Sequence, residues 1–148
     1  GSGHSGEHCL TLSVWAPDIS LQKAVGQRPC MVYFHGGDLT GGATGTNFSK
    51  LATHRSGLVV VDVSYRQNLA GFLSVDAMME ESASHTSGVF GFRDMLESLR
   101  WVKRNIAAFG GDASKVTIFG QSSGGTSVIA LVASPLASGL FSGALSLS

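Results

Sequence analysis

Residues 116–125 combine a strand, a sharp turn and the start of a helix, and this stretch constrains the fold more than any other. Residues 116–119 form the β-branched and aromatic run that is typical of a strand. Residues 123–133 predict a helix of small and apolar side chains. The turn between them reads Gly-Gln-Ser-Ser-Gly, with Ser122 in the centre. This is the G-x-S-x-G pattern of a nucleophile elbow, in the strand–turn–helix context that the pattern requires.

Ser122 is therefore a candidate nucleophile. A side chain at the apex of such a turn stands clear of the backbone, and the helix that follows directs its free amides and positive dipole end toward the serine oxygen. A developing oxyanion requires such an environment. Glycine- and serine-rich turns between a strand and a helix also occur without any catalysis, so the pattern has to be interpreted together with its neighbours.

A second glycine loop supplies such a neighbour. Residues 30–34 are a continuous apolar run, typical of a strand covered on both faces. The run is followed by residues 35–42, which read His-Gly-Gly-Asp-Leu-Thr-Gly-Gly. Glycines release the backbone of this loop from its usual φ limits.

The remaining segments predict an α/β fold with a mostly parallel sheet and flanking helices. Further strands are expected at residues 9–14, 58–63 and 144–147. Helices are expected at residues 48–55 and 92–109, and the second of these carries an apolar repeat at intervals of three and four. Residues 78–85 are polar, and we expect a surface loop there.

Composition narrows the classes of function. Lysine plus arginine and aspartate plus glutamate are each 10 of 148 residues, without a basic cluster, which argues against nucleic acid as a partner. No apolar run approaches the roughly 20 residues of a membrane span. The length fits one domain at most. We expect neither a cofactor nor a metal ion, and the sequence does not indicate an oligomeric state.

The segments together resemble the type-B carboxylesterase and cholinesterase family of α/β-hydrolases, over essentially the whole chain. No single match is specific, but the combination is. The matching segments are residues 7–17, 35–37, 64–66, 71–73, 99–102, 105–112 and 119–125.

The resemblance implies hydrolysis of a small-molecule carboxylic ester through a serine, an acidic residue and a histidine. It places the nucleophile on Ser122 and the oxyanion-hole amides on Gly37, Asp38 and Ser123. The family resemblance also suggests the secretory pathway as the location of the protein. The alternative is a non-catalytic adhesion or ligand-binding relative with the same fold, although such relatives commonly lack the serine.

The chain departs from the pattern of the family at four positions. Asp38 stands where most relatives have a third glycine, and a carboxylate there would repel an oxyanion if it turned inward. Gln121 replaces a glutamate, Val89 an asparagine and His8 an aspartate.

The position of the acid and the histidine is a further departure. In α/β-hydrolases both residues follow the nucleophile along the chain. None of the residues after Ser122 is Asp, Glu or His. We therefore expect residues 1–148 to be an incomplete, truncated α/β-hydrolase domain that is inactive alone, with an unpaired sheet edge near Ala144.

Three smaller features have alternative interpretations. Cys9 and Cys30 could form one bridge or be buried hydrophobic residues, while the resemblance implies that Cys9 pairs with an upstream cysteine outside this chain. Asn47 begins a glycosylation sequon or caps a helix. Arg66 and Asp94 are interpreted as structural ion-pair or hydrogen-bonding groups rather than catalytic ones.

Overall fold

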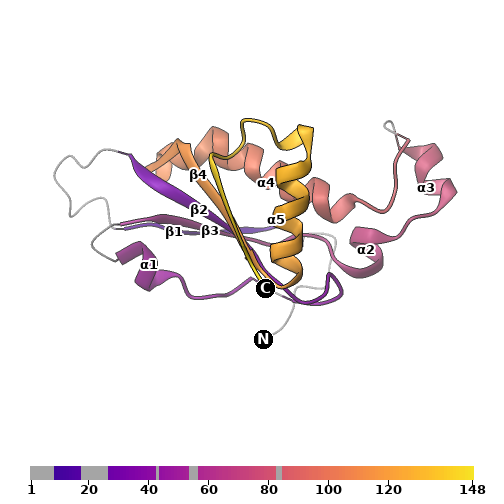
Figure 1. The fold of residues 1–148 in the computed structure, drawn as a ribbon, viewed down its shortest axis with the longest axis horizontal. Coiled ribbons are helices and arrows are strands. Elements are labelled where there is room, and N and C mark those ends of the chain that lie inside the picture. The colour runs from indigo at the N-terminus through magenta and orange to yellow at the C-terminus, as the bar shows by residue number, and fades with distance from the viewer. Residues whose placement is uncertain (1–8, 18–26, 43, 54–56, 83–84) are drawn as a thin grey trace.

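The computed structural model describes residues 9–17, 27–42, 44–53, 57–82 and 85–148. Within these residues, five strands form one sheet in the order β1-β3-β2-β4-β5 (Figure 1). β1 is antiparallel to β3, and all other neighbours are parallel. The strands are β1 Leu12–Trp15, β2 Arg28–Phe34, β3 Val59–Val63, β4 Gly111–Gln121 and β5 Gly143–Leu147.

The helices cover both faces of this sheet. Figure 1 shows α4 and α1 on opposite sides of it. The helices are α1 Ser49–Thr53, α2 Asn68–Phe72, α3 Asp76–Glu81, α4 Phe90–Asn105 and α5 Ser123–Ala133, with short 3-10 turns at Ile106–Phe109 and Pro135–Ala137.

The alternation of side chains along β2 divides the core into two parts. Val32 and Phe34 are fully buried in the larger cluster, together with residues of α4 and α5 such as Leu99 and Leu131. Tyr33 packs in a smaller cluster on the opposite face. Successive side chains of a strand point to opposite faces, so a strand buried on both sides has to be apolar throughout.

The prediction of an α/β fold with a mostly parallel sheet is confirmed, but one local prediction is wrong. Residues 78–85 were expected to form a loop, whereas the helix α3 occupies Asp76–Glu81. Six residues are too few to show an apolar repeat, and an acidic residue in the first turn, Asp76, favours the helix through its dipole. The short α2 was not predicted for the same reason.

Two predicted helices differ from the observed ones at their ends. The amphipathic segment is α-helical only to Asn105 and continues as a 3-10 turn to Phe109, where Gly110 ends it with a φ of 78°. Helix α1 begins at Ser49, and the last predicted residues of this helix, 54–55, lie outside the described residues. Strand β4 is longer than the predicted residues 116–119 because it begins at Gly111.

The ion pair between Arg66 and Asp94 is confirmed as a structural link between the segment after β3 and helix α4. The guanidinium donates from Nε to Oδ2 at 2.8 Å and from Nη2 to Oδ1 at 2.7 Å. The backbone amide of Arg66 donates to the same carboxylate at 3.0 Å. Such a bidentate pair fixes geometry as well as contributing energy.

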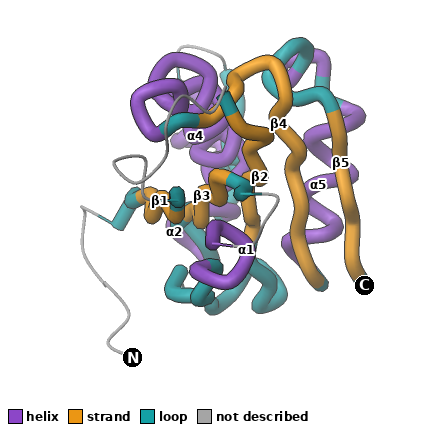
Figure 2. Tube along the Cα trace, turned by 90° about the vertical axis from the view of Figure 1, so that its left-hand side faces the viewer, coloured by secondary structure: helices purple, strands orange, loops and turns teal. Residues whose placement is uncertain are grey.

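β5 forms one edge of the sheet, as Figure 2 shows. It pairs with β4 on one side only, and its Leu145 and Leu147 are 46% and 43% exposed. An apolar edge strand with free amides and carbonyls is a template for pairing with another chain. No helix among the described residues is long and apolar enough to cross a membrane.

We predict that the 148-residue chain by itself self-associates through β5. A Leu145→Lys substitution should lower its weight-average mass toward that of the monomer, because a charge on an edge strand opposes pairing. Light scattering behind a sizing column measures this. Leu69→Lys, at a 68% exposed position of α2, is the control. An equal effect of both substitutions would contradict a role for the β5 edge.

Candidate functional site

The pairing of β2 with β4 brings the two glycine-rich turns together. The strands are parallel neighbours, and Phe34 is in register with Gly120. The chain leaves both strands at their carboxyl ends, on the same side of the sheet. Ligands of open α/β sheets bind at these ends. The loop that starts at His35 and the turn that holds Ser122 therefore lie side by side.

Ser122 has the strained conformation expected of an elbow. Its φ of 57° and ψ of −127° lie in a region that residues other than glycine rarely adopt. Two backbone bonds hold the turn, from Ser122 N to Leu147 O at 2.9 Å and from Thr126 N to Ser122 O at 3.0 Å. The residue is only partly buried. The serine is thus presented at a sharp bend and is open to solvent.

Helix α5 begins directly against the end of β2. A Cβ atom on Gly124 would collide with the carbonyl oxygen of Phe34, and one on Gly120 would collide with Gly124 itself. Both outer glycines of the G-x-S-x-G pattern are therefore required by close approach of backbones. The first backbone bond of the helix comes from Thr126, so the amide of Ser123 is free of the helical ladder.

The glycine loop touches the elbow. A Cβ atom on Gly36 would lie 2.7 Å from the oxygen of Gln121 and 3.1 Å from the Cβ of Ser122. The loop turns tightly after this contact, because the carbonyl of Gly37 accepts from the amides of Thr40 and Gly41 at 3.0 Å each. Within the described residues, the amides of Gly37 and Asp38 donate to no backbone acceptor.

Three of the four residues predicted as nucleophile or oxyanion-hole donors border one hollow of about 490 Å³. It is lined by Asp38, Ser122, Ser123, Thr126, Ile129, Ser146, Leu147 and Ser148. The structure thus brings together the candidate nucleophile with two of the three residues predicted to supply oxyanion-hole amides. The third, Gly37, directly precedes Asp38. The backbone amides near Ser122 make this a place that can stabilise a small anion.

His35 is buried against the glycine loop. It is not available as a base, because both of its ring nitrogens have hydrogen-bond partners. Its side chain is 4% exposed. Nδ1 contacts the oxygen of Gly36 at 2.8 Å, and Nε2 contacts the side-chain amide of Gln67 at 3.0 Å. A carbonyl oxygen can only accept, so the proton is on Nδ1 and the amide of Gln67 donates to Nε2. Both ring nitrogens are occupied.

Tyr65 is a supporting residue to which the sequence analysis assigned no role. Its hydroxyl donates to the carbonyl oxygen of His35 at 2.7 Å, and the two rings stack with centroids 4.6 Å apart. Burial raises the pKa of Tyr65 to about 12, so the hydroxyl keeps the proton that it donates. The signals in the sequence were the position of Tyr65 two residues after the predicted strand 58–63 and its place in the matching segment 64–66.

Asp62 is a buried carboxylate of β3 that binds the chain just after the glycine loop. Its side chain is fully buried, and Oδ2 accepts from the amide of Gly45 at 2.9 Å. Oδ1 has no partner within the described residues. Burial raises the pKa of Asp62 above its ordinary value, against the lowering effects of the Gly45 amide and of His35.

The other predicted residues lie apart from the hollow. Cys9 and Cys30 are both free, so the interpretation as a mutual bridge is wrong, whereas Cys30 is a buried hydrophobic residue as predicted. Burial raises the pKa of the Cys30 thiol to about 12. Asn47 is exposed, and its Oδ1 accepts from the amide of Ser49 at the start of α1. This bond agrees with the capping interpretation, while glycosylation of Asn47 stays a prediction.

The other histidines do not meet Ser122 in the part of the chain that is described. His85 is exposed, beyond α3. His4, His8 and His54 lie outside the described residues. Among the described residues there is also no group of three His, Cys, Asp or Glu side chains that could hold a metal ion.

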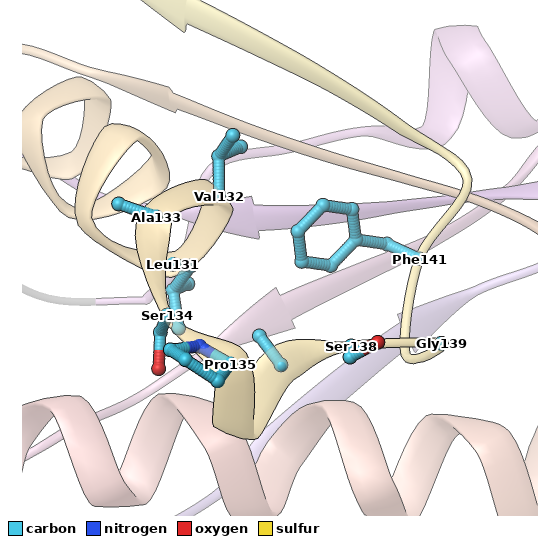
Figure 3. Close-up of a pocket in the computed structure, with 9 residues that line it drawn as sticks. Leu131, Val132, Ala133, Ser134, Pro135, Ser138, Gly139 and Phe141 are labelled. Carbon is cyan, nitrogen blue, oxygen red and sulfur yellow. The ribbon is translucent and has the colours of Figure 1, made fainter.

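A second hollow, of about 340 Å³, lies at the opposite end of α5. Figure 3 shows the ring of Phe141 facing Val132 across it, with Pro135 at its lower side. Its lining contains no ionisable side chain. It therefore offers no group that could serve as acid or base.

The chain is similar to known esterases. The family described as the carboxylesterase family matches residues 2–148. Carboxylesterase 3B of Mus musculus is 45% identical over 143 residues, and the cocaine esterase of Homo sapiens is 41% identical over 139. Among solved structures, carboxylesterase EST55 of Geobacillus stearothermophilus has a TM-score of 0.80 at 39% identity. A PNB esterase has a TM-score of 0.82 at 40% identity.

These similarities cover nearly all of this chain but a minor part of the relatives. The matches span 96% of the chain for the mouse enzyme, 94% for the human enzyme, 92% for EST55 and 95% for the PNB esterase. They span 24%, 23%, 29% and 29% of those proteins, respectively. The chain thus spans about a quarter of the length of the curated relatives.

We predict that Gly36→Ala destabilises the protein by about 1 to 3 kcal/mol, because the added methyl group has no room between the loop and the elbow. A urea titration of the free energy of unfolding measures this. Gly41→Ala is the matched control in the same loop, since a Cβ there meets nothing within 4 Å. The contact between loop and elbow is contradicted if both substitutions have the same small effect.

We also predict that Tyr65→Phe lowers the free energy of unfolding by about 1 to 3 kcal/mol, because it leaves the buried carbonyl of His35 without its donor. Tyr33→Phe provides the comparison. Its ring also packs in the core, against Phe48 and Phe119, but its hydroxyl has no hydrogen bond within the described residues. Equal losses from the two substitutions in the same denaturant titration would rule out this role for the Tyr65 hydroxyl.

Proposed function

Because this chain belongs to the carboxylesterase family, we propose that it is the nucleophile-bearing part of a serine hydrolase that cleaves carboxylic esters. The observation that carries the proposal is the position of Ser122. It lies at a strained turn, beside a helix N-terminus and a glycine loop with free amides, and it borders an open hollow. A surface serine in an ordinary turn requires none of these features.

The proposed reaction begins with attack of Ser122 Oγ on the carbonyl carbon of the ester. A serine hydroxyl is a poor nucleophile until a base takes its proton, so a histidine has to be within reach. The carbonyl oxygen becomes negative as the Oγ–C bond forms. The bond to the alcohol then breaks, the alcohol leaves with the proton held by the base, and water releases the acid from the acyl-serine.

The amides of Gly37, Asp38 and Ser123 are proposed to bind the negative oxygen. This charge exists only in the transition state and the tetrahedral intermediate, so donors aimed at it raise the rate rather than the affinity for the ester. In hydrolases, one such donor is worth roughly 3 to 4 kcal/mol. The dipole of α5 acts in the same direction.

The base and the acid are proposed to come from chain outside these residues. Both ring nitrogens of His35 are bonded within the fold, and no Asp, Glu or His follows Ser122. The curated relatives are about four times as long. Residues 1–148 by themselves are therefore proposed to be inactive or nearly so. The proposed esterase is the longest natural chain that contains them, which is here called the parent chain.

Labelling with a fluorophosphonate probe tests the proposal in the parent chain. We predict that the probe modifies Ser122 and that Ser122→Ala abolishes both the labelling and the hydrolysis of a neutral acetate ester. Ser138→Ala is the control, because this exposed serine lies near the far end of α5. Peptide mass spectrometry locates the modified residue.

Two results would overturn the proposal. A parent chain that is folded but not labelled would support the alternative of a non-catalytic adhesion or ligand-binding protein. Ester turnover at ordinary enzyme rates by residues 1–148 alone, lost in Ser122→Ala, would overturn the proposed external base. A faint turnover is compatible with an oxyanion hole acting without its triad.

A further inference from the structure

Asp38 places a carboxyl group at the candidate active site and forms no ion pair with the described residues. It is the only ionisable side chain among the residues that line the hollow at Ser122. Three chain segments border this hollow, at residues 35–42, 120–129 and 143–148. Their sequences contain no other Asp, Glu, Lys or Arg. No basic side chain of these segments therefore neutralises the carboxylate.

The backbone of the loop keeps Asp38 at the mouth of the hollow. Its φ is 54° and that of Leu39 is 61°, so two successive residues are in the left-handed region. The loop is held on both sides of this bend, by the contact of Gly36 with the elbow and by the bond from Asn68 N to Leu39 O at 2.6 Å. The Asp38 side chain is exposed rather than turned into the core.

We propose that Asp38 is a specificity-determining residue that makes the site select esters carrying a positive charge near the scissile bond and reject esters carrying a negative one. This inference rests on the proposed ester hydrolysis and names its substrate class. The amide of Asp38 serves the oxyanion, while its carboxylate acts on the rest of the substrate.

The physical reason is the sign of the charge that the substrate meets. Asp38 and Ser122 line the same hollow, so the carboxylate attracts a cationic group that lies two or three bonds from an ester carbon at Ser122 Oγ. For two unit charges about 5 to 6 Å apart, at an effective dielectric constant between that of a protein surface and that of water, this attraction raises a rate constant by about tenfold. An anionic group at the same place is disfavoured by a similar factor. A neutral ester of the same shape has no charge of its own for the carboxylate to attract or repel, so it shows only the effect of Asp38 on the oxyanion, which all three esters share.

A series of three acetate esters in the parent chain tests this inference. The alcohols are 3,3-dimethylbutanol, the isosteric quaternary ammonium alcohol and 2-hydroxyethanesulfonate, which differ in charge and little in size. We expect Asp38→Asn to lower the cation-to-anion ratio of kcat/KM by about tenfold or more. The neutral ester is the reference in each variant, because the substitution also changes the rate of all three esters through the oxyanion. Asparagine tolerates the left-handed conformation, so the loop is retained.

Two controls separate a charge effect from a structural one. Asp112→Asn removes the same charge at the start of β4, the end of the strand far from Ser122, and should leave all three ratios unchanged. The preference of the wild type should also shrink as salt rises from about 0.01 M to about 0.5 M, because the Debye length falls below the separation of the charges. If Asp38→Asn is poorly folded, Asp38→Gly also removes the carboxylate and suits the positive φ.

The outcomes distinguish this inference from the proposed function. Hydrolysis of the neutral ester that depends on Ser122, with the same charge preference in the wild type and in Asp38→Asn, overturns the role of Asp38 and leaves the esterase intact. Absence of Ser122-dependent hydrolysis of all three esters overturns both. A lowered and salt-sensitive cation preference in Asp38→Asn, with Asp112→Asn unchanged, supports the inference.

Discussion

The parallel register between β2 and β4 is the constraint on which the rest of the site depends. Phe34 pairs with Gly120, and each strand is followed at once by a glycine turn. A slip by one residue would move Val32 and Phe34 from the larger apolar cluster to the opposite face, so burial specifies the register strongly. The same packing that stabilises the core therefore positions Gly36 next to Ser122.

This arrangement concentrates close backbone contacts in a small volume. Ser122 has a conformation that costs of order 1 to 3 kcal/mol and persists only where the surroundings determine it. Its surroundings are the fully buried Phe34 and the start of α5, whose Val128 and Leu131 pack in the same cluster. The elbow is thus a strained turn held between well-packed elements, which suits a group that has to be presented in one orientation.

The polar groups around the glycine loop have separate tasks. Tyr65 and Gln67 bind His35, and the buried Asp62 binds the amide of Gly45. These contacts fix the position of the backbone. Near Ser122, the free amides of Gly37, Asp38 and Ser123 and the dipole of α5 favour negative charge, whereas the carboxylate of Asp38 opposes it. Under the proposed function, these neighbouring positive and negative groups discriminate among substrates as well as bind an oxyanion.

The sequence by itself determined the class of fold, the strands that build the centre of the sheet, and the turn that presents Ser122. These features are encoded locally, in apolar runs such as residues 58–63 and in glycines at fixed spacing. Short elements without a repeat, such as α3, were not predictable in this way. Only the tertiary structure decided that Cys9 and Cys30 are free, that Tyr65 and Gln67 support His35, and that Asp38 and Ser122 border the same hollow. Such relations join residues far apart in the chain, and they depend on the pairing and packing of whole elements, which no local pattern contains.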